Sequence, residues 1–189
     1  MNTLVVTPGE GVGPLKLGMT RQEIEESLAQ LRQELEVKAA LQVGRDEQDG
    51  GDCHCVRYMF GPLFFMVTYT PEEKAVGISI NRGAVEEELL DVVLLEQDVF
   101  RTEAEPLVEA LKVHDRCVHD QEDELLSFQY TFPALGVRLW REMPFHRKLL
   151  EDPAWMAEME AVLEDEYQHL YFDIVTVYVP DYGKVLCYL

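Results

Sequence analysis

Cysteine and histidine, the side chains that hold zinc in many proteins, occur together in two short segments of the chain. The first segment is Cys53-His54-Cys55 and the second is Cys117-Val118-His119. Structural zinc sites usually space their cysteines two to four residues apart on a turn. On a strand, the Cys-x-Cys spacing instead places both thiols on one face. We therefore expect half-buried thiols here, and we assign no metal and no other cofactor.

Glu166 and His169 have the Glu-x-x-His spacing of carboxylate-bridged metal helices. Such a site needs a second copy of the motif and further inward-facing acids, and the sequence has neither. The chain also lacks a Gly-x-Ser-x-Gly elbow, a dinucleotide-binding fingerprint and a phosphate-binding loop. Because thirty-six carboxylates make the choice of an acid–base pair arbitrary, we assign no catalytic residue.

Acidic residues are the most distinctive chemical feature of the chain. It has 36 acidic and 16 basic residues, a formal net charge of −20. Between Glu86 and Glu124, fourteen acidic residues accompany three basic ones. Two tracts in this region predict a partner-binding face, which consists of Glu86, Glu87, Glu88, Asp91, Asp120, Glu122, Asp123 and Glu124. The alternatives are solvated edges and, for the second tract, a calcium loop, although this tract lacks the central glycine of an EF-hand.

The charge balance bears on the class of partner. Nucleic acid and anionic membrane surfaces are disfavoured, because binding them requires clustered Lys and Arg. A basic protein is favoured, since an acidic face accelerates such an association by about 10 to 10³ through electrostatic steering. The alternative is that the charge serves solubility alone.

The elements that position these residues follow from capping signals and hydrophobic spacing. Thr20 and Glu23 have the spacing of a helix capping box. Thr102 and Glu105 repeat this spacing 82 residues later, with Pro106 in the first helical turn. Residues 86–95 suit either a short buried helix or a strand. Alternating apolar residues predict strands over residues 54–60, 63–70, 76–80, 125–132, 136–141, 171–179 and 184–189.

Two tracts of the sequence share the same residue pattern. Residues 58–67 align with residues 130–139, because both contain Tyr-x-Phe, a Gly/Pro corner, a leucine and then apolar residues at every second position. With the two capping signals, this alignment predicts an internal repeat over about 14–81 and 98–179. Residues 144–169 are then a helical insertion, whose expected inner stripe is Trp155, Met159, Val162 and Leu163.

The length of 189 residues suits a single domain over 1–189. We expect the α+β class, with two related helix-plus-antiparallel-strand units that form one curved sheet with helices on one face.

The segment from Pro8 to Ile24, with Gly18-Met19-Thr20 followed by Glu23, resembles the Gly-Met-Thr helix opening of two protein groups. These are the BamE-like lipoprotein domains and the beta-lactamase inhibitory protein family, which is built from tandem helix–sheet repeats. The segment is also similar to openings in uncharacterised bacterial proteins, some of them candidate immunity proteins. The resemblance covers about fifteen residues and the repeat, and the chain lacks the lipobox cysteine and the inhibitor's disulfide pairs. It implies an architecture whose known members bind proteins and catalyse no reaction.

Met1-Asn2-Thr3 has no basic region of the kind that opens a signal peptide, and no apolar run approaches the ~20 residues of a membrane-spanning helix. We therefore expect a cytoplasmic bacterial protein with reduced cysteines. The expected function is non-catalytic: an acidic immunity protein or inhibitor of a basic toxin or enzyme. One alternative is a small enzyme or ligand-binding domain with a pocket near Trp140, Trp155 and His169. Another is an oligomerisation module that uses an exposed strand edge.

Overall fold

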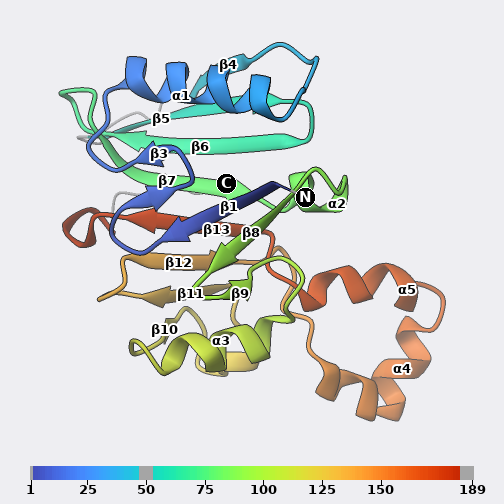
Figure 1. Cartoon of the computed structure of the whole chain (residues 1–189). Helices are drawn as coiled ribbons and strands as arrows, with labels where there is room; N and C mark the ends of the chain where they lie inside the picture. The colour runs from blue at the N-terminus through green and yellow to red at the C-terminus, as the bar shows by residue number, and fades with distance from the viewer. Residues whose placement is uncertain (1, 47–52, 184–189) are drawn as a thin grey trace.

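The computed structural model describes residues 2–46 and 53–183, so the strand expected over 184–189 lies outside the described residues. Helices and mainly antiparallel strands confirm the α+β class. The expected single sheet is wrong, because the described strands form two sheets (Figure 1). The smaller has the order β3-β2-β1-β8-β9, from β1 (Asn2–Thr7), β2 (Gly11–Val12), β3 (Leu15–Lys16), β8 (Leu90–Leu94) and β9 (Gln97–Asp98).

The larger sheet has eight strands in the order β10-β11-β12-β13-β7-β6-β5-β4. The first half of the chain supplies β4 (Gln42–Asp46), β5 (His54–Phe60), β6 (Leu63–Tyr69) and β7 (Ala75–Asn81). The second half supplies β10 (Val118–His119), β11 (Gln129–Phe132), β12 (Val137–Trp140) and β13 (Ile174–Tyr178). The order of the second set mirrors that of the first, and β7 pairs with β13 at the centre.

The smaller sheet exists because two strands that are distant in sequence each bury one face. Leu4 and Val6 are buried in β1, whereas Val5 between them is 52% exposed. In β8, Val92 and Leu94 are buried in the same alternating way, and β1 and β8 pair in parallel. A sheet with one apolar face must cover that face. Accordingly, β2 contacts both β7 and β13 of the larger sheet.

The first helix, α1 (Arg21–Glu34), begins as the sequence predicts. The Thr20 side chain accepts a hydrogen bond from the Glu23 amide, and the Glu23 carboxylate accepts one from the Thr20 amide at 2.7 Å. Its apolar stripe is buried over Ile24, Leu28 and Leu31. Figure 1 shows α1 near β4 to β6.

The second major helix, α3 (Ala104–Lys112), lies near β10 and β11 in Figure 1. The capping box predicted for Thr102 and Glu105 is wrong. Glu103 is the N-cap residue and makes no side-chain capping bond. Glu105 instead forms an ion pair with the buried Arg141, at 3.2 Å. The segment that suited either a helix or a strand contains the end of a short helix, α2 (Gly83–Glu86), and then β8.

The two tracts that align in sequence form the hairpins β5–β6 and β11–β12. Tyr58 pairs with Phe65 in the first hairpin, and Tyr130 pairs with Leu139 in the second. The alignment shifts by two residues at the turn, because residues 61–62 connect the first hairpin and residues 133–136 the second. Gly136 closes the longer turn with φ +62°, and a Cβ there would lie only 2.4 Å from the Tyr178 carbonyl oxygen.

Residues 144–169, which we call the inserted arm, leave the larger sheet after β12 (Figure 1). They contain η2 (Arg147–Glu151), α4 (Pro153–Met159), α5 (Leu163–Glu166) and most of η3 (Tyr167–Leu170). Asp152 caps α4 through the Ala154 amide, at 2.9 Å. Trp155 stacks on the buried Phe145, with ring centroids 5.4 Å apart. The inner position expected for Val162 is wrong, since this side chain is 42% exposed.

One cluster of buried apolar residues joins the two halves of the chain, and it includes Leu28 of α1, Leu107 of α3 and Val175 of β13. Two further short helices are η1 (Glu124–Leu126) and η4 (Pro180–Tyr182). Within the ranges 2–46 and 53–183, every helix is too short or too polar to span a bilayer.

Candidate functional site

The first predicted acidic tract lies on α2 and β8, and two of its four side chains are engaged inside the molecule. Glu86 forms an ion pair with Arg82 at 2.8 Å, and Asp91 forms one with Arg101. Glu87 and Glu88 are exposed, and no ion pair or side-chain hydrogen bond to another described residue involves them.

The second predicted tract lies around η1, and three of its four side chains have structural partners. Asp120 accepts hydrogen bonds from two backbone amides of residues 128 and 129, at 3.0 and 3.1 Å. Asp123 caps η1 through the Leu125 amide, and Glu124 pairs with Lys112 at 2.6 Å. Glu122 is exposed. Figure 1 shows α2 and β10 well apart, so the structure does not bring the two tracts together.

The inserted arm carries a third group of acidic residues, which lies outside the two predicted tracts. Residues 149–168 contain seven acidic residues and neither Lys nor Arg. Most of these side chains are exposed, namely Glu151, Asp152, Glu158, Glu160, Glu164 and Asp165. None of the ion pairs between described residues includes them. The arm therefore presents uncompensated negative charge.

The arm is fastened to the body by contacts at both of its ends. Arg147 pairs with Glu103 through Nε at 2.8 Å and through Nη2, and these hydrogen bonds lower the pKa of Glu103. The backbone carbonyl of Phe145 accepts a hydrogen bond from Arg141 at 3.0 Å. At the other end, the Gln168 carbonyl accepts one from Arg82 at 2.7 Å.

Arg82 stands at a cleft where α2, the end of the arm and the start of β13 meet. Besides Gln168, its guanidinium contacts Glu86 at 2.8 Å and Asp173 at 3.1 Å. Two cavities flank it and share Arg82, Glu86 and Gln168 in their linings. We call them the Phe100 cavity, of about 410 Å³, and the Trp140 cavity, of about 290 Å³.

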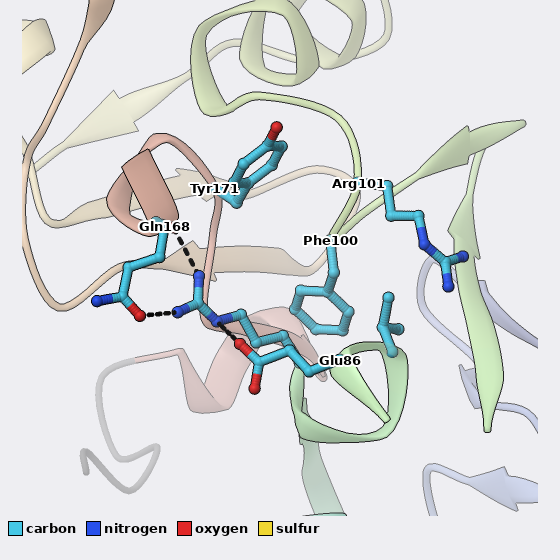
Figure 2. Close-up of a pocket in the computed structure, with 7 residues that line it drawn as sticks. Glu86, Phe100, Arg101, Gln168 and Tyr171 are labelled. Carbon is cyan, nitrogen blue, oxygen red and sulfur yellow. Dashed lines mark hydrogen bonds and ion pairs between the residues drawn. The ribbon is translucent and has the colours of Figure 1, made fainter. Parts of the chain in front are cut away.

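The Phe100 cavity has an apolar floor and charged walls (Figure 2). Phe100 and Val85 are buried beneath it, and Tyr171 lies at its rim. Arg101 extends away from Glu86 and pairs with Asp91, whose hydrogen bond raises the pKa of Arg101. Since Arg82 and Arg101 both bind carboxylates already, the described lining of this cavity offers no free cation to an anionic ligand.

The Trp140 cavity is rich in hydrogen-bond acceptors, and strand ends position them. Trp140 ends β12 and Asn81 ends β7, and both pair in register with Ile174 at the start of β13. The Oδ1 atom of Asn81 is buried and has no hydrogen-bond partner within residues 2–46 and 53–183. Glu142 follows β12, and its amide donates to the Asp173 carboxylate at 2.7 Å. The complete lining is Asn81, Arg82, Gly83, Glu86, Trp140, Glu142, Gln168, Asp173 and Ile174.

Sequence reasoning found only part of this cleft. Of the three residues named for a pocket, Trp140 lines a cavity, whereas Trp155 packs within the arm. Asn81, Glu142 and Asp173 were missed, because each is a single polar residue at the end of an apolar strand. Their shared position at strand ends is the signal that would have indicated them, once the pairing of β7, β12 and β13 is known.

The cysteine and histidine segments do not assemble a metal centre within the described part of the chain, where no group of three or more His, Cys, Asp or Glu residues has suitable geometry. Burial raises the pKa of the Cys117 thiol to about 11. Cys55 is disulfide-bonded, which differs from the expectation of reduced cysteines.

Comparison with known proteins adds no assignment to this geometry: no family model, curated protein or solved structure matches the chain.

Proposed function

We propose that this protein is a non-catalytic bacterial binding protein that captures a basic protein partner, as an immunity protein or inhibitor does with a toxin or enzyme. The observation that carries the proposal is the exposed, unpaired acidic surface of the inserted arm, in a chain of net charge −20. The predicted tracts contribute Glu87, Glu88 and Glu122, whereas their other acids are engaged inside the molecule.

The electrostatics of the arm favour capture. Charges within a Debye length of about 8 Å at physiological ionic strength act together on an approaching partner. Several carboxylates on the two short helices α4 and α5 therefore produce a local negative field, which steers a basic surface and accelerates association. The exposed arm carboxylates have no ion pair with a described residue. They can therefore bind a cationic side chain of a partner without first breaking an internal ion pair.

The scaffold suits presentation of such an arm. We infer that the two halves are copies of one helix-plus-strands unit, an inference supported by the mirrored strand order and by the corresponding hairpins β5–β6 and β11–β12. Two units that share a core make a rigid framework, and the ion pair of Arg147 with Glu103 fastens the arm to it.

The test compares the wild-type chain with two variants of equal charge change. The arm variant carries Glu158→Gln, Glu160→Gln and Glu164→Gln, and the control carries Glu10→Gln, Glu26→Gln and Glu72→Gln at exposed sites elsewhere. Each is immobilised and exposed to extract of the source cells, and retained proteins are identified and purified. Association rates with the purified partner are then measured at low and high salt.

We expect a basic protein that the wild type and the control retain and the arm variant releases. Its association rate should fall about tenfold for the arm variant at low salt and converge with the wild type at high salt. Equal association rates for all three forms would show that the arm charges do not steer the partner.

A further inference from the structure

We propose that the Trp140 cavity is an anchor site for an arginine side chain of the basic partner. The inference deepens the proposed function and rests on it, because it names the group that the partner inserts. The observations that support it concern the residues that line the cavity, and they do not include the exposed carboxylates of the arm.

The polar groups of the cavity accept hydrogen bonds and carry negative charge. Three carboxylates, those of Glu86, Glu142 and Asp173, face one guanidinium, that of Arg82. The Asn81 Oδ1 atom adds a further acceptor at the end of β7, and it has no hydrogen-bond partner among the described residues. A ligand that matches this lining must be a cationic donor.

The size and the aromatic wall of the cavity narrow the ligand further. A volume of about 290 Å³ lies at the lower end of ligand pockets, which suits one side chain better than a larger ligand. Trp140 belongs to the lining, and tryptophan is the best aromatic partner for a cation. An extended side chain can lay its methylene stem along Trp140 and Ile174 while its head reaches the carboxylates.

Arginine fits this arrangement better than lysine. Its planar guanidinium has five N–H donors and stacks on aromatic faces, whereas the ammonium of lysine has three. The chain itself supplies a precedent, since Arg82 binds Glu86, Asp173 and the Gln168 carbonyl at the boundary of the same cavity. Glu142, which also lines the cavity, is exposed and has no ion pair with a described residue.

The location also agrees with the proposed function. Gln168 belongs both to the inserted arm and to the lining of the cavity. A basic partner steered by the arm therefore arrives beside the cavity. Interfaces of this kind concentrate affinity in a few anchored residues, among which arginine is enriched.

The probes for the experiment are N-acetyl-arginine amide, N-acetyl-lysine amide and the neutral isostere N-acetyl-citrulline amide. Heteronuclear NMR of the full chain follows titration by each probe. We expect the arginine probe to shift the side-chain amide of Asn81 and the indole of Trp140 saturably, the lysine probe to do so more weakly, and the citrulline probe to leave them unchanged.

Glu142→Gln is the matched variant, and Glu72→Gln is its control. Glu72 lies in the turn before β7, at the opposite end of the strand from Asn81. We expect Glu142→Gln to weaken both the arginine probe and the purified partner about tenfold, as the loss of an anchoring charge pair does. Glu72→Gln should leave both affinities unchanged.

The outcomes separate this inference from the proposed function. If the partner associates in an arm-dependent manner but the arginine probe causes no shift at Asn81 or Trp140, the arginine anchor is wrong and the capture function stands. An equal response to the citrulline probe would likewise overturn the anchor. If the arginine probe binds as expected but no basic protein depends on the arm, the capture function fails instead.

Discussion

Among single residues, the buried Arg141 holds together more segments than its place in the sequence indicates. It lies just after β12, and its side chain is fully buried. Its guanidinium lies 5.4 Å from the ring centroid of Tyr130 and 6.0 Å from that of Phe172. Hydrogen bonds run from it to Ser127, Phe145, Leu125, Tyr130 and Glu105. The hydrophobic pattern of the sequence does not predict these hydrogen bonds, because it reports only the spacing of the apolar residues around Arg141.

Replacement of this side chain tests its role. We expect Arg141→Met to lower the free energy of unfolding by about 3 to 5 kcal/mol, because the variant leaves several buried acceptors and Glu105 without a donor. The control is Arg147→Met, which removes an exposed ion pair to Glu103 and should change stability little. Denaturant unfolding measures both variants, and equal midpoints for the two would show that the Arg141 network is dispensable.

At the scale of elements, local signals predict the fold wherever a bond partner lies within a few residues. The capping box at Thr20 and the strands β5, β6 and β7 agree with the sequence, since their patterns are local. The Thr102 signal fails because its acidic partner is taken by Arg141, 36 residues further along the chain. The hairpin turn of residues 133–136 is two residues longer than its counterpart, and it lies against Tyr178, which is distant in sequence.

These two threonines form a matched pair for a test. We expect Thr20→Ala to lower the free energy of unfolding by about 1 kcal/mol, because it removes both the hydroxyl that accepts from the Glu23 amide and one bond to the Glu23 carboxylate. Thr102→Ala removes the same atoms from a residue that is not the N-cap of α3. It should therefore lower the free energy of unfolding much less than Thr20→Ala does. Chemical denaturation compares the two, and the reverse order of their effects would contradict the assigned helix start.

At the scale of the whole molecule, two strand pairs join distant parts of the chain: β7 with β13, where the two halves meet, and β1 with β8. The side chains of Ser79 and Thr176 hydrogen bond across the first pair at 2.8 Å, and both residues are buried. The second pair joins Leu4 to Val92, which are distant in sequence, and it creates the smaller sheet. Sequence periodicity specifies that each strand has an apolar face but not which distant strand it joins, so the division into two sheets emerged only from the structure.

The pairing of β7 with β13 and the shared core predict that the chain unfolds as one cooperative unit. Both tryptophans, Trp140 and Trp155, lie in the second half, so their fluorescence reports on that half alone, whereas far-ultraviolet circular dichroism reports on the whole chain. Leu28 of α1 is fully buried in the first half, and Leu28→Ala should destabilise the protein by about 2 to 5 kcal/mol. Because the halves share one core, the midpoints from fluorescence and from dichroism should fall together in urea. A fluorescence midpoint that stays in place while the dichroism transition moves would mean that the second half folds on its own.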